Sequence, residues 1–395
     1  MTAGVDALPR SLWWLVAAQA LLLSGSAMLI SVNGLSGLLL APDPAWATLP
    51  ITSFVLGGAL SSLPMSMLMQ RHGRARGFAL GCLAAFVGAM LTAAALLLGS
   101  FTLLCVGTFV FGIYNAAGQY LRFAAADLVA PTRRARALSL VLAGGLLGGF
   151  LGPALSRSTV DWWEPRFLAT YLCLILLSVG VYLLTRRVHF PPPVAVPGGT
   201  RGASLRALAR RPGFWLAVAA SASAWAVMNM LMAASPLAMQ ACAYPFADAA
   251  WALQWHMLGM YAPMLVMGSI LERIGARAAI GLGILITALS IGVAHHGTSV
   301  AHFVAALSLL GLGWALLFGG GNALLTQQHH ESEKGLAQGI HDALMFAAMA
   351  VSSLLAARGA TLAGWIDLQW LGWIGMAAMA LTLLILGPRV RPLAA

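Results

Sequence analysis

Charge is scarce in this chain: of its 395 residues, only 8% are Asp, Glu, Lys or Arg, whereas 60% are hydrophobic. A soluble domain has about 25% charged and about 45–50% apolar residues. Because water cannot solvate the outside of so apolar a chain, the composition predicts an integral membrane protein. The apolar runs are long and continuous rather than alternating, which favours helices over a β-barrel.

Cysteine is rare as well, with four residues and no CxxC pair. Three of the four lie within apolar runs and only Cys242 falls in an expected loop, which excludes a disulfide framework, a zinc finger and a thioredoxin-like motif. The sequence also lacks a nucleophile–base pair, a phosphate-binding loop and an HExxH motif. We therefore expect neither an enzyme nor a bound cofactor.

What the sequence does contain is a series of apolar segments, each about 20 residues or more in length, as a spanning helix requires. We predict an all-α membrane protein with twelve spans, at residues 12–34, 46–69, 77–98, 100–125, 137–157, 166–186, 213–235, 251–271, 278–296, 301–325, 336–357 and 369–387. A polar stretch rich in Pro, Gly and Arg divides them. The predicted domains are an N-terminal six-helix bundle (1–187), a cytoplasmic linker (188–212) and a C-terminal six-helix bundle (213–395).

The positive charges are unevenly placed between the spans. Eighteen of the 22 Lys and Arg residues fall on the side of the two termini, and only Arg157, Arg166 and Arg358 fall in the opposite loops. The positive-inside rule therefore predicts cytoplasmic termini in a cell inner membrane. This asymmetry also explains the net charge of +11 without a nucleic-acid partner, so the lipid bilayer is the expected surrounding.

The two predicted bundles carry similar short loops. LMQRHGRARG (68–77) follows the second span, and LERIGARAAIG (271–281) follows the eighth. Both place an Arg two residues before a Gly and another Arg soon after it. Internal repeats of this kind are typical of transporters with a substrate path between two halves.

These loops resemble the signature of the major facilitator superfamily, roughly G-x-L-x-D-R-x-G-R-R/K. The first loop matches at Leu68, Arg71, Gly73 and Arg74, and departs at Ser66, Gln70 and Ala75. The second loop keeps Gly268, Leu271, Glu272, Arg273, Gly275 and Arg277. The resemblance implies a two-bundle facilitator fold that works by alternating access. It also implies gating loops at Arg71, Gly73, Arg74, Glu272, Arg273, Gly275 and Arg277.

Two pairs of side chains stand out in the second half. Met228 and Met232 lie four residues apart in the seventh span, and His256 and Met260 lie four apart in the eighth. Residues at this spacing share one helix face. Both pairs fall in the outer half of the membrane by helix rise, and thioether with imidazole favours a soft ion such as Cu(I). Packing is the alternative interpretation, because Met commonly fills gaps in apolar interiors.

The paired motif, M-x-x-x-M followed by H-x-x-x-M, resembles the CcoA-type copper importers of the facilitator superfamily. The resemblance implies a secondary transporter that imports copper for assembly of cbb-type cytochrome oxidase, with copper chaperones or oxidase assembly factors as partners. It assigns metal binding to Met228, Met232, His256 and Met260. We expect a monomer.

Further candidates and alternatives remain open. Met239 and Cys242, and on the eleventh span His341, Met345 and Met349, could relay copper, although packing or solvation explains them equally well. On span four, Arg122 and Asp127 are expected to pair with each other or with an inner loop. A drug or metabolite transporter of the same fold, an exporter, explains the topology equally well. A third hypothesis is a membrane assembly factor that holds copper without moving it.

Overall fold

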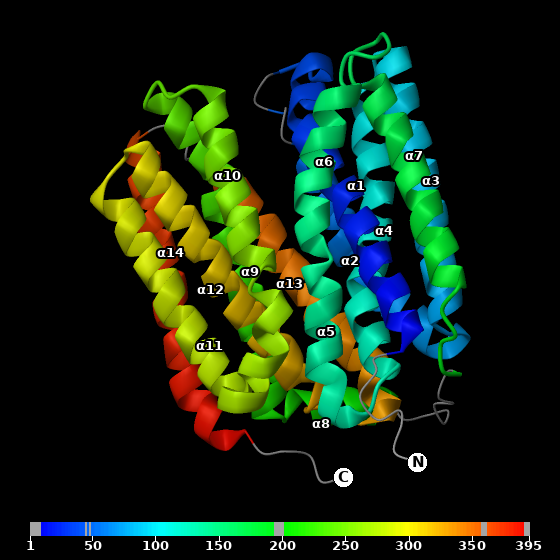
Figure 1. Cartoon of the computed structure of the whole chain (residues 1–395), viewed down its shortest axis with the longest axis vertical. Coiled ribbons are helices and arrows are strands. Elements are labelled where there is room, and N and C mark those ends of the chain that lie inside the picture. Colours follow the sequence, from blue (N-terminus) through cyan, green and yellow to red (C-terminus); the bar gives the residue numbers. More distant parts are fainter. Residues whose placement is uncertain (1–8, 44–45, 47–48, 193–200, 357–361, 391–395) are drawn as a thin grey trace. The chain divides into compact units, whose positions relative to one another are not determined.

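In the computed structural model, the residues described are 9–43, 46, 49–192, 201–356 and 362–390, and they form helices joined by short turns (Figure 1). The predicted all-α fold class is confirmed. The helices in chain order are α1 (Arg10–Leu40), α2 (Leu49–His72), α3 (Arg74–Leu98), α4 (Phe101–Asp127), η2 (Pro131–Arg133), α5 (Arg134–Ala143), α6 (Gly145–Thr159), α7 (Leu168–Arg186), α8 (Arg201–Ala209), α9 (Pro212–Ala241), α10 (Phe246–Tyr261), α11 (Met264–His296), α12 (Val300–Thr326), η3 (Glu331–Glu333), α13 (Lys334–Ala356), α14 (Leu362–Leu386) and η5 (Gly387–Arg389).

Eleven helical segments of the described chain are long and apolar enough to cross a membrane. The predicted eighth span, 251–271, is interrupted, because α10 ends at Tyr261 after 16 residues and α11 begins at Met264, directly after Pro263. Proline has no backbone N–H and clashes with the preceding turn, which explains a break at this point. The predicted ninth span then follows inside α11, beyond a kink at Gly275 where φ is 77°.

Three details of the predicted elements differ in the structure. The predicted fifth span consists of two helices, α5 and α6, which meet at Gly144. The predicted linker contains a helix, α8, within residues 188–212, while residues 193–200 of that linker lie outside the described residues. Met239, which follows the predicted seventh span (213–235), lies in the last turn of α9.

The chain forms two compact units. The first comprises Met1–Ile51 and Leu68–Pro193, and the second comprises Thr52–Met67 and Val194–Ala395. The middle of α2 therefore groups with the C-terminal helices, although the sequence-based division placed it in the N-terminal bundle. The bounds of the two bundles stay a prediction.

Each unit repeats the same close contact between two helices. In the first unit, a Cβ at Gly88 of α3 would lie 2.8 Å from the carbonyl oxygen of Gly107 on α4. In the second unit, a Cβ at Gly283 of α11 would lie 3.1 Å from the carbonyl oxygen of Gly313 on α12. The second helix of each pair also begins alike, since the side chains of Ser100 and Ser299 accept a backbone N–H in the first turn of α4 and of α12. The internal similarity seen in the loops thus extends to helix packing.

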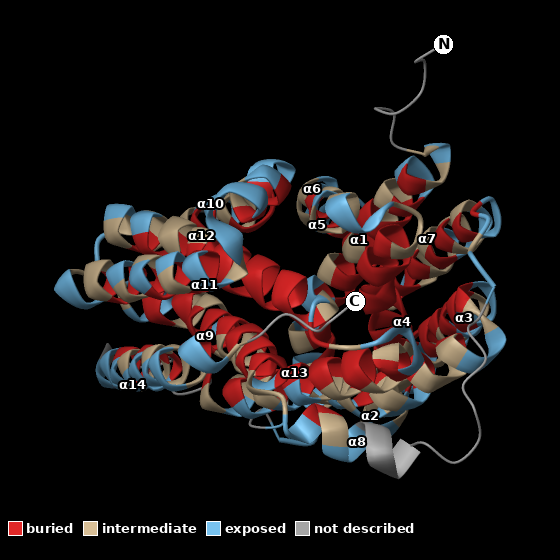
Figure 2. Cartoon of the chain, turned by 90° about the horizontal axis from the view of Figure 1, so that it is seen from below, coloured by how far each residue is buried: buried red, intermediate tan, exposed pale blue. Residues whose placement is uncertain are grey.

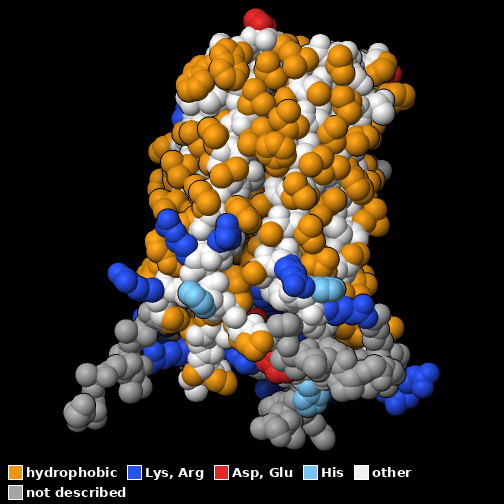
Figure 3. Space-filling model, turned by 90° about the vertical axis from the view of Figure 1, so that its right-hand side faces the viewer, with side chains coloured by type: hydrophobic (Ala, Val, Ile, Leu, Met, Phe, Trp, Pro, Cys, Tyr) orange, Lys and Arg blue, Asp and Glu red, His pale blue; other side chains and the backbone are white. Residues whose placement is uncertain are grey.

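Burial and charge fit a membrane-embedded chain. Helices carry buried residues on one side and exposed residues on the other (Figure 2), and the exposed positions include many large apolar side chains, such as Leu98 at 74% and Leu384 at 73%. Hydrophobic side chains cover most of the face seen in Figure 3, and Lys and Arg gather toward one end. Lipid rather than water satisfies such a surface.

Candidate functional site

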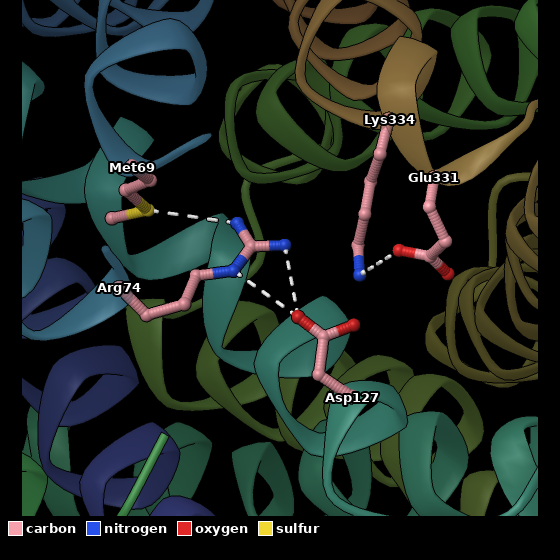
Figure 4. Close-up of polar contacts among 5 residues, drawn as sticks. All are labelled: Met69, Arg74, Asp127, Glu331 and Lys334. Carbon is pink, nitrogen blue, oxygen red and sulfur yellow. Dashed lines mark hydrogen bonds and ion pairs between the residues drawn. The ribbon is translucent and has the colours of Figure 1, made fainter. Parts of the chain in front are cut away.

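The predicted gating loop of the first half forms a tight turn with a buried ion pair. Gly73 adopts φ 90° between α2 and α3, a conformation that glycine reaches without steric cost. Arg74 follows it and donates Nε and Nη2 to Oδ2 of Asp127 on α4, at 3.4 Å each, and its Nη1 contacts the sulfur of Met69 (Figure 4). Both charged side chains are 10% exposed. Asp127 therefore pairs with the loop between α2 and α3, while Arg71 is exposed.

The gating loop of the second half repeats the turn, but among the described residues it has no ion pair like that of Arg74 and Asp127. Gly275 has φ 77°, matching Gly73, and Arg277 donates Nη1 to the carbonyl oxygen of Gly387 at 2.9 Å. Glu272 and Arg273 are exposed. An ion pair of this unit lies at the junction of η3 and α13 instead. There, Lys334 Nζ lies 3.2 Å from Glu331 Oε2 (Figure 4).

The sequence left the partner of Arg122 on α4 open. In the structure its side chain is buried, with 1% of its surface exposed. It donates Nη1 to Oε1 of Gln119 one turn earlier, and its guanidinium lies 4.5 Å from the ring centroid of Phe123. Gln119 and a second α4 amide, Asn115, are also buried, and Asn115 accepts from Ser26 of α1. The first unit thus holds a polar cluster within a membrane helix, where a buried charge survives only among such partners.

The predicted metal ligands of the eighth span face α12. His256 is fully buried, and its Nδ1 lies 2.8 Å from the carbonyl oxygen of Leu307 on α12. Met260 is 2% exposed, and its backbone N packs against Gly311 of the same helix. Within the described chain, Nε2 of His256 has no hydrogen-bond partner. This bond to Leu307 fixes the ring orientation and leaves Nε2 as the atom available to a proton or a ligand.

The ligands predicted on the seventh span belong to α9. Met228 is 1% exposed, whereas Met232 is half-buried. Among the described residues, no three His, Cys, Asp or Glu side chains form a group suited to a metal ion, and the Met thioethers are not counted among these. The four-residue copper site therefore stays a prediction.

The proposed relay residues occupy two places. His341, Met345 and Met349 of α13 are buried, and His341 Nδ1 lies 2.7 Å from Oδ1 of the adjacent Asp342, which is itself fully buried. Met239 is buried near the end of α9, and Cys242 caps that helix with its side chain partly exposed.

Sequence reasoning missed an aromatic cluster in the second unit. Trp225 of α9 lies perpendicular to Trp314 and Phe318 of α12, with ring centroids 5.2 Å and 5.7 Å away. Trp314 and Phe318 stack on each other at 4.9 Å, and Tyr261 of α10 meets Trp314 edge to face at 5.9 Å. Helix periodicity could not reveal it, because each of these residues alone resembles an ordinary core position.

Comparison with known proteins places this architecture. Residues 15–259 match the family described as Major Facilitator Superfamily. Among curated proteins, the riboflavin transporter RfnT of Brucella anthropi is 35% identical over 388 residues, covering 97% of this chain and 96% of that protein. YdeG of Bacillus subtilis, described as an uncharacterized MFS-type transporter, is 28% identical over 360 residues, covering 87% of this chain and 82% of that protein.

Solved structures agree at the level of the fold. The transporter FucP in the outward conformation has a TM-score of 0.76 at 16% identity. The alignment covers 97% of this chain and 100% of the FucP chain. A bacterial homologue of the iron transporter ferroportin in the outward-facing state has a TM-score of 0.73, also at 16% identity, with 96% and 98% covered. At this identity the likeness concerns chain topology alone.

Proposed function

Since the chain belongs to the Major Facilitator Superfamily, we propose that it is a secondary transporter of a flavin-type metabolite, riboflavin or a molecule with the same planar ring system. The observation that carries this proposal is the similarity to the riboflavin transporter of Brucella anthropi, which extends over nearly the whole of both chains. This similarity favours the metabolite-transporter alternative over copper import. Because 18 of 22 positive charges lie on one side of the predicted topology, we place the protein in the inner membrane with cytoplasmic termini.

The chemistry of the second unit fits a neutral aromatic substrate. The cluster of Trp225, Tyr261, Trp314 and Phe318 offers aromatic faces and indole N–H groups, and none of its members carries a charge. Aromatic walls with a few polar groups are typical of small-molecule sites. An inorganic cation would gain little from indole N–H donors, whose positive ends repel it.

Copper import is the second candidate, and one observation favours it. His256 buries an Nε2 without a partner in the described chain, and Met260 lies one helical turn further along the same helix. Neutral imidazole and thioether are suitable ligands for Cu(I). The relatives identified above give copper no support, so this candidate depends on the motif and on that single nitrogen.

One experiment separates the two candidates. The purified full chain is reconstituted in liposomes loaded with unlabelled riboflavin, and uptake of external radiolabelled riboflavin is followed. Such counterflow needs neither a known coupling ion nor a known physiological direction. We expect counterflow in these liposomes and none in liposomes without the protein. In parallel liposomes supplied with Cu(I) and a reductant, we expect no accumulation of copper.

Variants sharpen the comparison. His256→Gln, and Met228→Leu combined with Met232→Leu, remove the proposed copper ligands with little change in volume, and we expect both to retain riboflavin counterflow. Copper accumulation that disappears in these variants, together with absent riboflavin counterflow in the wild type, would reverse the ranking of the two candidates.

A further inference from the structure

We propose that Trp225 of α9 is the surface on which the planar ring of the substrate stacks, with Trp314 and Phe318 of α12 fixing its orientation. This inference rests on the proposed function, since it assigns the ring-binding residue of the flavin transporter. Three features of the aromatic cluster carry it: a face of Trp225 that its aromatic neighbours leave uncovered, two indole N–H groups without a partner in the described residues, and the position of the cluster along its helices.

The geometry leaves a face of Trp225 uncovered by its aromatic neighbours. Its interplanar angles to Trp314 and Phe318 are 89° and 87°, so each contact joins the edge of one ring to the face of another. Edges of the neighbours can cover one face of Trp225 at most, and the residue remains half-buried, unlike Trp314 at 2% exposed and Phe318 at 1%. A planar ligand ring can stack on the remaining face, as bases stack on aromatic side chains.

The hydrogen-bonding state of the cluster points to a missing acceptor. The Nε1 atoms of Trp225 and Trp314 are both buried, and within the described residues neither has a partner. An indole N–H is a donor only, and leaving one unpaired in a buried site costs about 1–3 kcal/mol. An apolar side chain at either position would avoid that cost. Two such donors on rings that contact each other are explained by a ligand that brings acceptors, and a flavin ring carries carbonyl oxygens and ring nitrogens at its edge.

The position of the cluster fits a transport site. Trp225 lies 13 residues after the start of α9 at Pro212, and Trp314 lies 14 residues after the start of α12 at Val300. At 1.5 Å per residue both lie about 20 Å along their helices of 30 and 27 residues, which places each near the middle of its helix. Substrate sites of secondary transporters lie near this depth. One turn before Trp225, Ser221 adds a buried hydroxyl that also lacks a partner in the described chain.

The test measures binding of riboflavin to the purified full chain in detergent, by equilibrium dialysis and by loss of riboflavin fluorescence on stacking against an indole. Trp225→Ala removes the stacking surface and is expected to weaken binding roughly 5- to 150-fold, the range for loss of one stacked ring. Trp225→Phe keeps a ring but loses Nε1 and a large part of the indole face, so its loss is expected to be smaller. Trp13→Phe, at an exposed position of α1, is the matched control and should bind as the wild type does.

Competition gives an arm that needs no variant and so does not depend on folding of Trp225→Ala. Lumichrome, which is the ring without the ribityl chain, should displace riboflavin, and ribitol should not. Displacement by ribitol alone, or equal affinity of wild type and Trp225→Ala with a matching melting temperature, overturns the stacking surface while the transport proposal stands. Absence of riboflavin binding by the wild-type protein in dialysis overturns the proposed function, and the stacking surface with it.

Discussion

Arg211 donates both of its terminal nitrogens to Glu333: Nη1 lies 2.6 Å from Oε2, and Nη2 lies 3.1 Å from Oε1. Nη1 also donates to the carbonyl oxygen of Gln328 at 2.9 Å. Arg211 is the residue before α9, and Glu333 closes η3 directly before α13. A planar guanidinium matches a carboxylate in this two-bond geometry, which lysine cannot reproduce. The pair therefore holds the starts of two membrane helices of the second unit together.

Breaking this pair from one side should destabilise the protein more than replacing both partners. Glu333 is 8% exposed, so Glu333→Ala leaves the Arg211 charge without its carboxylate in a poorly hydrated place, at a cost on the order of 3 kcal/mol. Arg211→Met combined with Glu333→Leu removes both charges and should lose less. Thermal unfolding in detergent, followed by tryptophan fluorescence, measures both. Equal losses for the single and double variants would show that charge burial is not the cause.

The ion pair of the first unit makes a comparable prediction. Asp127→Ala removes the carboxylate that Arg74 contacts through Nε and Nη2, and both side chains are only 10% exposed. We expect a lower melting temperature and slower riboflavin counterflow, since the turn at Gly73 loses its fixed neighbour. Arg71→Gln alters an exposed charge of the same loop and is the control. An Asp127→Ala protein that melts and transports like the Arg71→Gln protein would contradict a structural role for the pair.

The sequence predicted the elements that depend on local patterns. Apolar length predicted the spans, and the repeated Arg-x-Gly pattern led to Gly73 and Gly275, which both adopt positive φ in equivalent turns. It also drew attention to residues four apart on one helix, such as His256 and Met260. The aromatic cluster joins positions that lie 36 to 93 residues apart along the chain, Trp225, Tyr261 and Phe318. Such contacts, and the missing partners of two indole nitrogens, are visible only once the helices are packed.

The break of the eighth predicted span shows the same limit. The sequence shows Pro263 within the predicted span. Whether a proline bends a membrane helix or ends it, however, depends on the residues packed around it. Likewise, the sequence left open whether Asp127 pairs with Arg122 or with a neighbouring loop, and helix packing brings it to Arg74 of the loop.

Close packing of α10 on α12 gives a prediction about glycine. A Cβ at Gly311 would lie 2.5 Å from the carbonyl oxygen of His256 and 2.7 Å from the backbone N of Met260, and backbone atoms cannot move aside cheaply. Gly311→Ala should therefore destabilise the protein by about 1–3 kcal/mol. Gly281→Ala on α11 is the matched control, because its Cβ would meet only a side-chain atom of Leu383 at 3.5 Å. Melting temperatures of the two variants decide the point: a Gly311→Ala protein as stable as Gly281→Ala would mean that α10 and α12 are further apart than described.

The turn between α12 and η3 contains a pH-sensitive group. Burial lowers the pKa of His329 from its ordinary 6.5 to about 4, and a hydrogen bond between Nδ1 and the carbonyl oxygen of His330 opposes this only in part. His329 is therefore neutral in the folded protein at pH 5, whereas in the unfolded chain it takes up a proton near pH 6.5. Its contribution to stability is complete above that value and is lost progressively as the pH falls toward 4.

The melting temperature should thus fall between pH 7.5 and pH 5 by less in His329→Gln than in the wild type. His296→Gln, at an exposed position, is the control and should follow the wild type. An identical pH profile for His329→Gln and wild type would show that His329 is accessible to protons in the folded state.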